Sequence, residues 1–444
     1  MWQLAWPAVV MNLLQSTVGL VDTKAVGTLG SAAVAAATAG HRMQFLLQAL
    51  LLAASAGTTA LVARAWGAND RDEAGRVMIA SLALGFGIAL VMAVVGLLIA
   101  EPFAVAFGLD DEPARLAATY IRWISVFNPA LAAGFVLLAG LRAVGDTRTP
   151  LLVGATANVV NVMLLYLFVY GGLGFPKLGI AGAALAGGLA FTTISVLSGA
   201  MWLRGWLAFA PRFAGALDRA RLRRLIAVGY PAALEQLVFQ SGFIVFTFLM
   251  ADYGTAALAA YGIGVQILSL SFVVGFGFSI AASTLVGQHL GARDPARATA
   301  SGWRAMRFAV GSMSVLSVLI IALAEPIARS MIDDPEVVRL TVAFIYTLGV
   351  AQPLMAVDFA LSGALRGAGD TRFPLLTTIA SLICGRVLLA SLFAWRGLRV
   401  EWIYGALLAD YVIKATFMIT RFRSGRWQTV LSQPADSDAP AQAA

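Results

Sequence analysis

Long apolar runs recur along the whole chain and are separated by short polar segments. An α-helix needs about 20 consecutive apolar residues to cross a lipid bilayer, and the runs reach this length. The pattern therefore predicts an all-α membrane protein with twelve transmembrane helices. The predicted helices lie near residues 2–26, 32–63, 76–100, 113–141, 149–170, 179–203, 225–251, 256–287, 303–324, 337–365, 373–395 and 402–420.

The second half of the chain repeats the first half without a gap between Pro7 and Pro150. Each half then holds six helices, and because six is an even number both halves enter the membrane from the same side. We expect two parallel lobes around a central cleft, related by a pseudo-two-fold axis along the membrane normal, which is an arrangement suited to alternating access. Adding 224 to the residue number carries Pro7 onto Pro231, Gly67-Ala68 onto Gly291-Ala292, Glu101-Pro102 onto Glu325-Pro326, and Gly145-Asp146-Thr147-Arg148 onto Gly369-Asp370-Thr371-Arg372.

The repeat and the polar breaks predict four parts of the chain. Residues 1–203 form an N-terminal lobe and residues 225–424 a C-terminal lobe, each with six helices. Residues 204–224 are basic and form the longest break, which we expect to be a cytoplasmic linker. Residues 425–444 end in a polar stretch rich in alanine and proline, so we expect a disordered cytoplasmic tail.

Composition and charge agree with a membrane protein. Hydrophobic residues make up 60% of the chain and charged residues only 12%, about half the share that is typical of soluble domains. The net charge of +8 lies in short loops between apolar runs, which favours a membrane surface over nucleic acid as the partner. Basic residues gather on alternate breaks, so both termini are predicted to be cytoplasmic, in a multi-pass protein of the bacterial inner membrane.

Several segments are similar to those of the multidrug and toxic compound extrusion (MATE) family. They are LRAVGDTRTP and LRGAGDTRFP at the repeat ends, DTKAVGTLGSAAVAA, GFGFSIAASTLVGQHLGA and RFRSGRW. The segment PAALEQLVFQ resembles the DNA-damage-inducible F-like (DinF-like) branch of that family. The resemblance covers nearly the whole chain. It implies export of amphipathic, often cationic, small molecules, driven by a proton or cation gradient.

Asp22 is the first candidate for the coupling site, because an ionisable residue inside an apolar helix is expensive and is a functional candidate by default. An unpaired carboxylate in a low-dielectric environment favours its neutral form, so it can take up and release a proton near neutral pH. Gln15 lies seven residues earlier on the same helix face. The resemblance places the coupling acid here and an Asn pair, Asn158 and Asn161, beside it. An interfacial role for Asp22, and simple interhelical hydrogen bonding by the two amides, are the alternatives.

Glu235 and Asp358 are predicted to lie at similar depth in the C-terminal lobe, where they can attract a cationic substrate or an ion. Met355 occupies the position at which sodium-coupled relatives carry an acid, and this departure weakens the sodium interpretation. Met, Phe and Tyr side chains, Tyr120 among them, are expected to line the cleft with these residues.

Two further features concern helix bending and charge pairing. Pro7 and Pro231 lie inside predicted helices, where proline removes a backbone hydrogen bond and permits a hinge. Arg386 and Asp410 fall at similar depths on adjacent helices, and we expect them to form a structural ion pair.

The predicted function is a secondary active multidrug exporter that exchanges amphipathic or cationic compounds for protons. A sodium-coupled exporter and a lipid-linked oligosaccharide flippase of the same superfamily are the alternatives. The single cysteine, Cys384, and the two histidines, His41 and His289, do not provide the ligands of a metal site, and no catalytic constellation is present in the sequence. We expect a monomer without a resident cofactor, which is not an enzyme.

Overall fold

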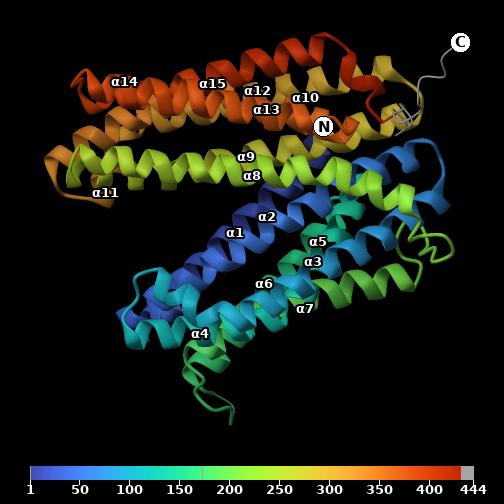
Figure 1. The fold of residues 1–444 in the computed structure, drawn as a ribbon, viewed down its shortest axis with the longest axis horizontal. Helices are drawn as coiled ribbons and strands as arrows, with labels where there is room; N and C mark the ends of the chain where they lie inside the picture. Colours follow the sequence, from blue (N-terminus) through green and yellow to red (C-terminus); the bar gives the residue numbers. More distant parts are fainter. Residues whose placement is uncertain (1, 173, 432–444) are drawn as a thin grey trace, which may run out of the picture. The chain divides into compact units, whose positions relative to one another are not determined.

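A computed structural model describes residues 2–172 and 174–431. Within these ranges the secondary structure is helical, and eleven helices are long and apolar enough to cross a membrane, or twelve when one bent pair counts as a single span. This confirms the predicted all-α membrane fold. The residues divide into an N-terminal unit, Trp2–Ala233, and a C-terminal unit that begins at Leu234. Within each unit the long helices run roughly side by side (Figure 1).

The N-terminal unit contains seven helices and the first part of an eighth. In this unit α2 packs against α3, α4 and α5, while α1 packs mainly against α6. The helices are α1 (Trp2–Gly27), α2 (Ser31–Gly67), α3 (Arg71–Ala106), α4 (Asp111–Val126), α5 (Asn128–Ala143), α6 (Arg148–Tyr170), α7 (Ile180–Leu203) and α8 (Arg219–Asp252).

The fourth predicted span, 113–141, consists of two helices rather than one. The chain bends by 52° between α4 and α5, at Phe127. Pro129 lies in the first turn of α5, where its missing N–H and fixed φ suit the start of a new helix but not the continuation of an old one.

The C-terminal unit contains the rest of α8 and the remaining helices, with α9 packed along α12. The eleventh predicted span, 373–395, has a π-helical turn in its middle, at which Gly385 lets the backbone of α15 approach closely at Asp410. The helices are α9 (Thr255–Gly291), α10 (Pro295–Ala322), α11 (Ala324–Met331), α12 (Pro335–Ala368), α13 (Arg372–Ser381), η1 (Leu382–Leu388), α14 (Leu389–Trp395), α15 (Val400–Arg423) and η2 (Arg426–Thr429).

The repeat is visible in the turns that start α3 and α10. Asn69 and Arg293 both adopt a left-handed backbone, with φ of 60° and 57°. The next residue in each turn, Asp70 or Asp294, caps its helix by accepting a backbone N–H at 2.8 Å. Because the two turns are 224 residues apart (293 − 69 and 294 − 70), the sequence repeat is also a structural repeat.

Both candidate hinge prolines lie inside helices. Pro7 is in α1 and Pro231 is in α8. Pro231 lies shortly before Leu234, the residue at which α8 passes from the N-terminal unit into the C-terminal unit.

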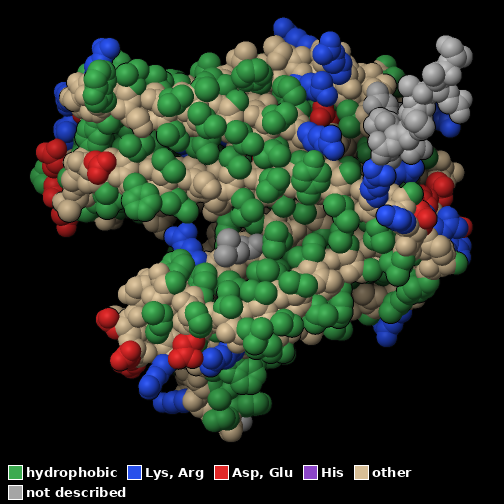
Figure 2. All heavy atoms as spheres, in the orientation of Figure 1, with side chains coloured by type: hydrophobic (Ala, Val, Ile, Leu, Met, Phe, Trp, Pro, Cys, Tyr) green, Lys and Arg blue, Asp and Glu red, His purple; other side chains and the backbone are tan. Residues whose placement is uncertain are grey.

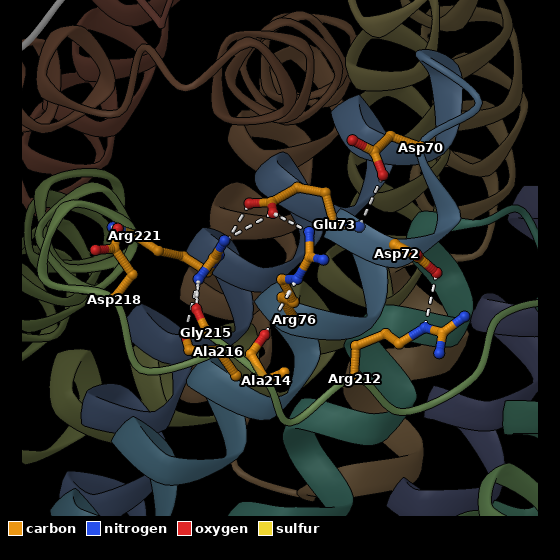
Figure 3. Close-up of polar contacts among 10 residues, drawn as sticks. All are labelled: Asp70, Asp72, Glu73, Arg76, Arg212, Ala214, Gly215, Ala216, Asp218 and Arg221. Atoms are coloured by element: carbon orange, nitrogen blue, oxygen red, sulfur yellow. Dashed lines mark hydrogen bonds and ion pairs between the residues drawn. The ribbon is translucent and has the colours of Figure 1, made fainter.

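The segment between α7 and α8 is bound to the start of α3, as Figure 3 shows, and we refer to residues 204–218 as the clasp. The Arg212 Nε lies 2.7 Å from Asp72, and Arg221 at the start of α8 makes a two-pronged pair with Glu73 at 2.9 and 2.7 Å. Arg76 donates to the Ala214 carbonyl at 3.3 Å. Residues 219–224, predicted to be linker, form the first turns of α8 because these contacts hold the helix start in place.

The chain after α15 is ordered through residue 431, although the sequence predicts disorder from 425. Trp427 is fully buried, stacks on Phe422 with ring centroids 4.6 Å apart, and donates from its indole to the Phe422 carbonyl at 2.9 Å. The aromatic stack explains the difference, since burial of two rings offsets the loss of chain entropy. Residues 432–444 of the predicted tail lie outside the described residues.

Many of the exposed side chains are apolar. Figure 2 shows hydrophobic side chains over the middle of the helices of each unit and charged side chains mainly near the helix ends. Residues such as Leu98, Leu152 and Phe248 are exposed by 68–74%. Such a surface is suited to contact with lipid tails rather than water.

Candidate functional site

The coupling candidate Asp22 lies in α1 and is half-buried. Its Oδ1 atom is buried and accepts no hydrogen bond from any residue in the described ranges. The carboxylate interacts electrostatically with Tyr120 of α4. The Tyr120 hydroxyl in turn lies 3.5 Å from Nε2 of His41 on α2. Asp22 is therefore an acid with free acceptor capacity that interacts with Tyr120, which in turn contacts His41.

Tyr120 holds its position because α2 carries a glycine opposite it. The tyrosine ring packs directly on Gly40, where a side chain would collide with it. The ring is 7% exposed and belongs to the N-terminal unit. Tyr120 lies in the N-terminal unit, whereas Glu235 and Asp358 lie in the C-terminal unit. That the three residues line one cleft stays a prediction.

The predicted amide cradle around Asp22 is not formed. Asn158 is half-buried and Asn161 is buried, but across the described part of the chain neither donates a hydrogen bond to Asp22. The Asn161 amide nitrogen instead faces α7, 4.0 Å from the position that a side chain at Gly187 would take. Gln15 is exposed on α1. The direction in which the Asn161 side chain points depends on how α6 is rotated against α7. The spacing of residues in the sequence does not determine this rotation.

In the C-terminal unit, Glu235 of α8 pairs with a cation. Its Oε1 lies 3.5 Å from Nη2 of Arg366, and the same Nη2 donates to Ser362 at 2.5 Å. Asp358, Ser362 and Arg366 follow one another at intervals of four residues, so they share one face of α12. Glu235 and Asp358 also interact electrostatically, so we describe them as one group.

The group continues toward α15. The predicted ion pair is present, because Arg386 in the π turn lies 2.5 Å from Asp410, and the two side chains are only 4% and 2% exposed. Lys414 follows Asp410 by four residues on the same helix face. Its ammonium lies 5.1 Å from the ring centroid of Phe239 on α8 and is 2% exposed.

Sequence reasoning missed the contributions of Lys414 and Arg366. Lys414 interacts electrostatically with all three acids, Glu235, Asp358 and Asp410. The signal was available in the sequence, because Lys414 is four residues after Asp410 inside an apolar run. We refer to Glu235, Asp358, Arg366, Arg386, Asp410 and Lys414 together as the charge network.

Met355 does not join the charge network. It is fully buried in α12 and serves as core packing rather than as a lining residue of a site.

Glu235 and Asp358 have no acidic counterparts in the first repeat. Met11 and Gly134 occupy the matching positions (11 + 224 and 134 + 224). Conversely, the buried Phe246 matches Asp22. The two repeats thus share a fold and differ in their acids.

Comparison with known proteins decides the family. The sequence model of the family described as MatE matches residues 7–167 and again residues 231–390, more than half of the chain. The chain belongs to the MATE family. The two matches start 224 residues apart (231 − 7), in agreement with the repeat. This MATE protein is accordingly a transporter and not an enzyme; its assignment to the DinF-like branch stays a prediction.

Relatives and solved structures support this assignment over almost the full length. The MATE chain is 29% identical to the Probable multidrug resistance protein NorM of Thermotoga maritima, over 96% of this chain and 92% of that protein. A protein of the same name from Bradyrhizobium diazoefficiens is 30% identical over 95% of this chain and 92% of its own. The crystal structure of the Vibrio cholerae MATE transporter VcmN in the bent form is 22% identical and shares the fold, with a TM-score of 0.87 over 96% of this chain and 97% of that chain.

Proposed function

We propose that this MATE protein is a multidrug exporter that exchanges amphipathic, cationic compounds for protons by alternating access. The observation that carries the proposal is Asp22, an acid inside a transmembrane helix whose buried oxygen has no hydrogen-bond donor among the described residues. Such a carboxylate can bind a proton, accept a hydrogen bond from an N–H group of a substrate, or pair with the positive charge of a substrate. The NorM relatives, both named as probable multidrug resistance proteins, support the class of substrate.

The charge network favours protons over sodium as the coupling ion. A sodium site needs several oxygen ligands whose negative charge is not already compensated. In this chain Glu235 pairs with Arg366 and Asp410 pairs with Arg386, while Asp358 interacts electrostatically with Lys414 and Arg366. The carboxylates of the charge network are therefore balanced by protein cations. Asp22 forms no ion pair among the described residues, so its charge is available to a mobile ion.

Alternating access is supported by the two structural repeats and by the proline in α8. Pro231 leaves the carbonyl one turn earlier without its helical N–H donor, next to the point where α8 passes between the units. We further propose that the transporter acts as a monomer in the bacterial inner membrane, with both termini in the cytoplasm and without a resident cofactor. The arginine-rich polar segments support this orientation.

Transport by purified protein in proteoliposomes tests the proposal. Efflux of a cationic dye such as ethidium is measured under an imposed pH gradient, and separately under an imposed sodium gradient, for wild type, Asp22→Asn and Asp252→Asn. Asp252 is exposed at the end of α8 and undergoes the same chemical change, so it is the matched control.

We expect the pH gradient to drive efflux by wild type and Asp252→Asn, and to drive none by Asp22→Asn. Efflux driven by sodium alone would replace the proposal by the sodium-coupled alternative. Proton-driven efflux by Asp22→Asn at the wild-type rate would remove Asp22 from the mechanism.

A further inference from the structure

The charge network is electrically balanced. It contains three carboxylates, Glu235, Asp358 and Asp410, and three cations, Arg366, Arg386 and Lys414. All six lie in the C-terminal unit, on α8, α12, the π turn and α15. A buried charge without compensation is strongly destabilising, so the balance is a condition for the unit to fold around these side chains.

The three cations are held in different ways. Arg386 and Asp410 form a close pair at 2.5 Å, and Arg366 reaches Glu235 and Ser362. This leaves Asp358 without an ion pair of its own within the described residues. Asp358 shares a helix face with Arg366, which is already paired, and it also interacts electrostatically with Lys414. Lys414 is therefore the cation that balances the third carboxylate.

The surroundings of Lys414 come from two helices, its own helix α15 and α8. Asp410 lies one turn before it on α15, and the ring of Phe239 on α8 lies under its ammonium at 5.1 Å. Glu235 lies one turn before Phe239 on the same face of α8. A second ring, that of Tyr411, is 5.7 Å away. Two aromatic faces and the surrounding carboxylates form a place for one monovalent cation, and a lysine side chain fills it.

The fold itself does not require these charges. The first repeat builds the same helices with Met11 and Gly134 at the positions that match Glu235 and Asp358. Glu235 and Asp358 are thus specific to the second repeat, whereas Arg366 matches Arg142 of the first repeat (366 − 224). We therefore relate the role of the two acids to what the C-terminal unit binds or excludes.

We infer that Lys414 is a tethered counter-cation, which occupies the place where Glu235, Asp358 and Asp410 would otherwise bind a free monovalent cation. The lysine makes the C-terminal unit independent of sodium and so determines ion specificity. This inference builds on the proposed function, because it explains why proton uptake is left to the N-terminal unit.

The test uses the dependence of thermal unfolding on sodium. Purified full-length protein is heated in sodium chloride or in N-methyl-D-glucamine chloride at equal ionic strength, and unfolding is followed by intrinsic tryptophan fluorescence. Lys414→Met removes the charge and keeps the length of the side chain. Lys414→Arg keeps the charge, and the double variant Lys414→Met with Asp358→Asn restores the balance of the network.

We expect wild type, Lys414→Arg and the double variant to unfold at the same temperature in both salts. Lys414→Met is expected to unfold at a lower temperature and to regain about 3 °C or more as sodium is added, because an ion that binds only the folded state stabilises it. A wild type that sodium stabilises in the same way, or a Lys414→Met variant that responds equally to both salts, would overturn the inference.

A second comparison covers the case in which Lys414→Met does not fold. Asp358→Asn alone leaves one excess positive charge, so the double variant is expected to be more stable than either single variant. A double variant that is less stable than Asp358→Asn would contradict the pairing. Failure of this inference can be distinguished from failure of the proposed function. When Asp22→Asn is added to each of these variants, the response of its unfolding temperature to sodium should stay the same, whether or not efflux is lost.

Discussion

Arg386 and Asp410 illustrate how a single pair of residues affects stability inside a membrane protein. The Nη2 atom of Arg386 and the Oδ2 atom of Asp410 are 2.5 Å apart, and neither side chain is exposed by more than 4%. Removing one partner leaves an unpaired buried charge, which costs about 3–5 kcal/mol, whereas removing both leaves none. The pair therefore contributes little net stability by its presence and much instability when it is broken.

A double-mutant cycle tests this at the residue scale. Arg386→Met and Asp410→Asn are each expected to lower the free energy of unfolding by about 3–5 kcal/mol. The double variant is expected to lose clearly less than the sum, because neither charge is then uncompensated. The measurement is an unfolding titration with a denaturing detergent. Additive losses in the double variant would show that the two side chains act independently.

Sequence reasoning at this scale identified single residues better than their contacts. The unpaired Asp22 and the Arg386–Asp410 pair were predictable, because depth in a helix follows from residue number. The contacts of Asn161 and Tyr120 were not, because they depend on how each helix is rotated against its neighbours. The close packing of Tyr120 on Gly40 fixes one such rotation, and a sequence does not reveal which glycine will lie opposite which ring.

At the scale of elements, the clasp changes the nature of the connection between the repeats. Arg212 and Arg221 bind Asp72 and Glu73 at the start of α3, so this connection is attached to the N-terminal unit rather than free (Figure 3). Arg221 also donates to the carbonyls of Gly215 and Ala216. The Arg221 side chain is 13% exposed, which makes its pair with Glu73 stronger than a typical surface ion pair.

Limited proteolysis tests the clasp. Glu73→Gln is expected to speed tryptic cleavage after Arg204 and Arg212 about five-fold, since a loss of about 1 kcal/mol raises the open population by that factor. The exposed Glu112→Gln, in the first turn of α4, serves as a control and should leave the cleavage rate unchanged. Equal cleavage of wild type and Glu73→Gln would mean that the ion pairs do not hold the segment.

The end of the chain offers another test at this scale. Trp427→Ala is expected to lower the free energy of unfolding by about 3–5 kcal/mol, because it removes a fully buried ring and its stacking on Phe422. Trp395 is 79% exposed, and Trp395→Ala should change stability by no more than about 0.5 kcal/mol. Equal stability of the two variants in a detergent titration would refute a structural role for the residues after α15.

Hydrophobic runs predicted the existence of the helices well and their irregularities poorly. The runs 2–26 and 149–170 agree with α1 and α6 to within about a residue. The bend at Phe127 and the π turn at Leu382–Leu388 were missed, because a run remains apolar through a change in hydrogen-bond pattern.

A side chain also replaces a backbone hydrogen bond that a proline removes. Pro353 in α12 leaves the Gly349 carbonyl without its helical N–H donor, and the Ser317 hydroxyl donates to that carbonyl at 2.6 Å.

At the scale of the whole molecule, two copies of one fold carry different chemistry. In the N-terminal unit, the transmembrane acid Asp22 forms no ion pair among the described residues, whereas in the C-terminal unit Glu235 pairs with Arg366 and Asp410 pairs with Arg386. In our account the N-terminal unit binds and releases the proton, and the C-terminal unit does not bind free cations.

Proton release on substrate binding tests this division most directly. Tetraphenylphosphonium is added to purified protein in weakly buffered solution, and the protons released are counted with a pH-sensitive dye. We predict about one proton for each cation bound by wild type, Glu235→Gln and His41→Gln, and none for Asp22→Asn. Undiminished release by Asp22→Asn, or a loss of release in Glu235→Gln alone, would contradict the account.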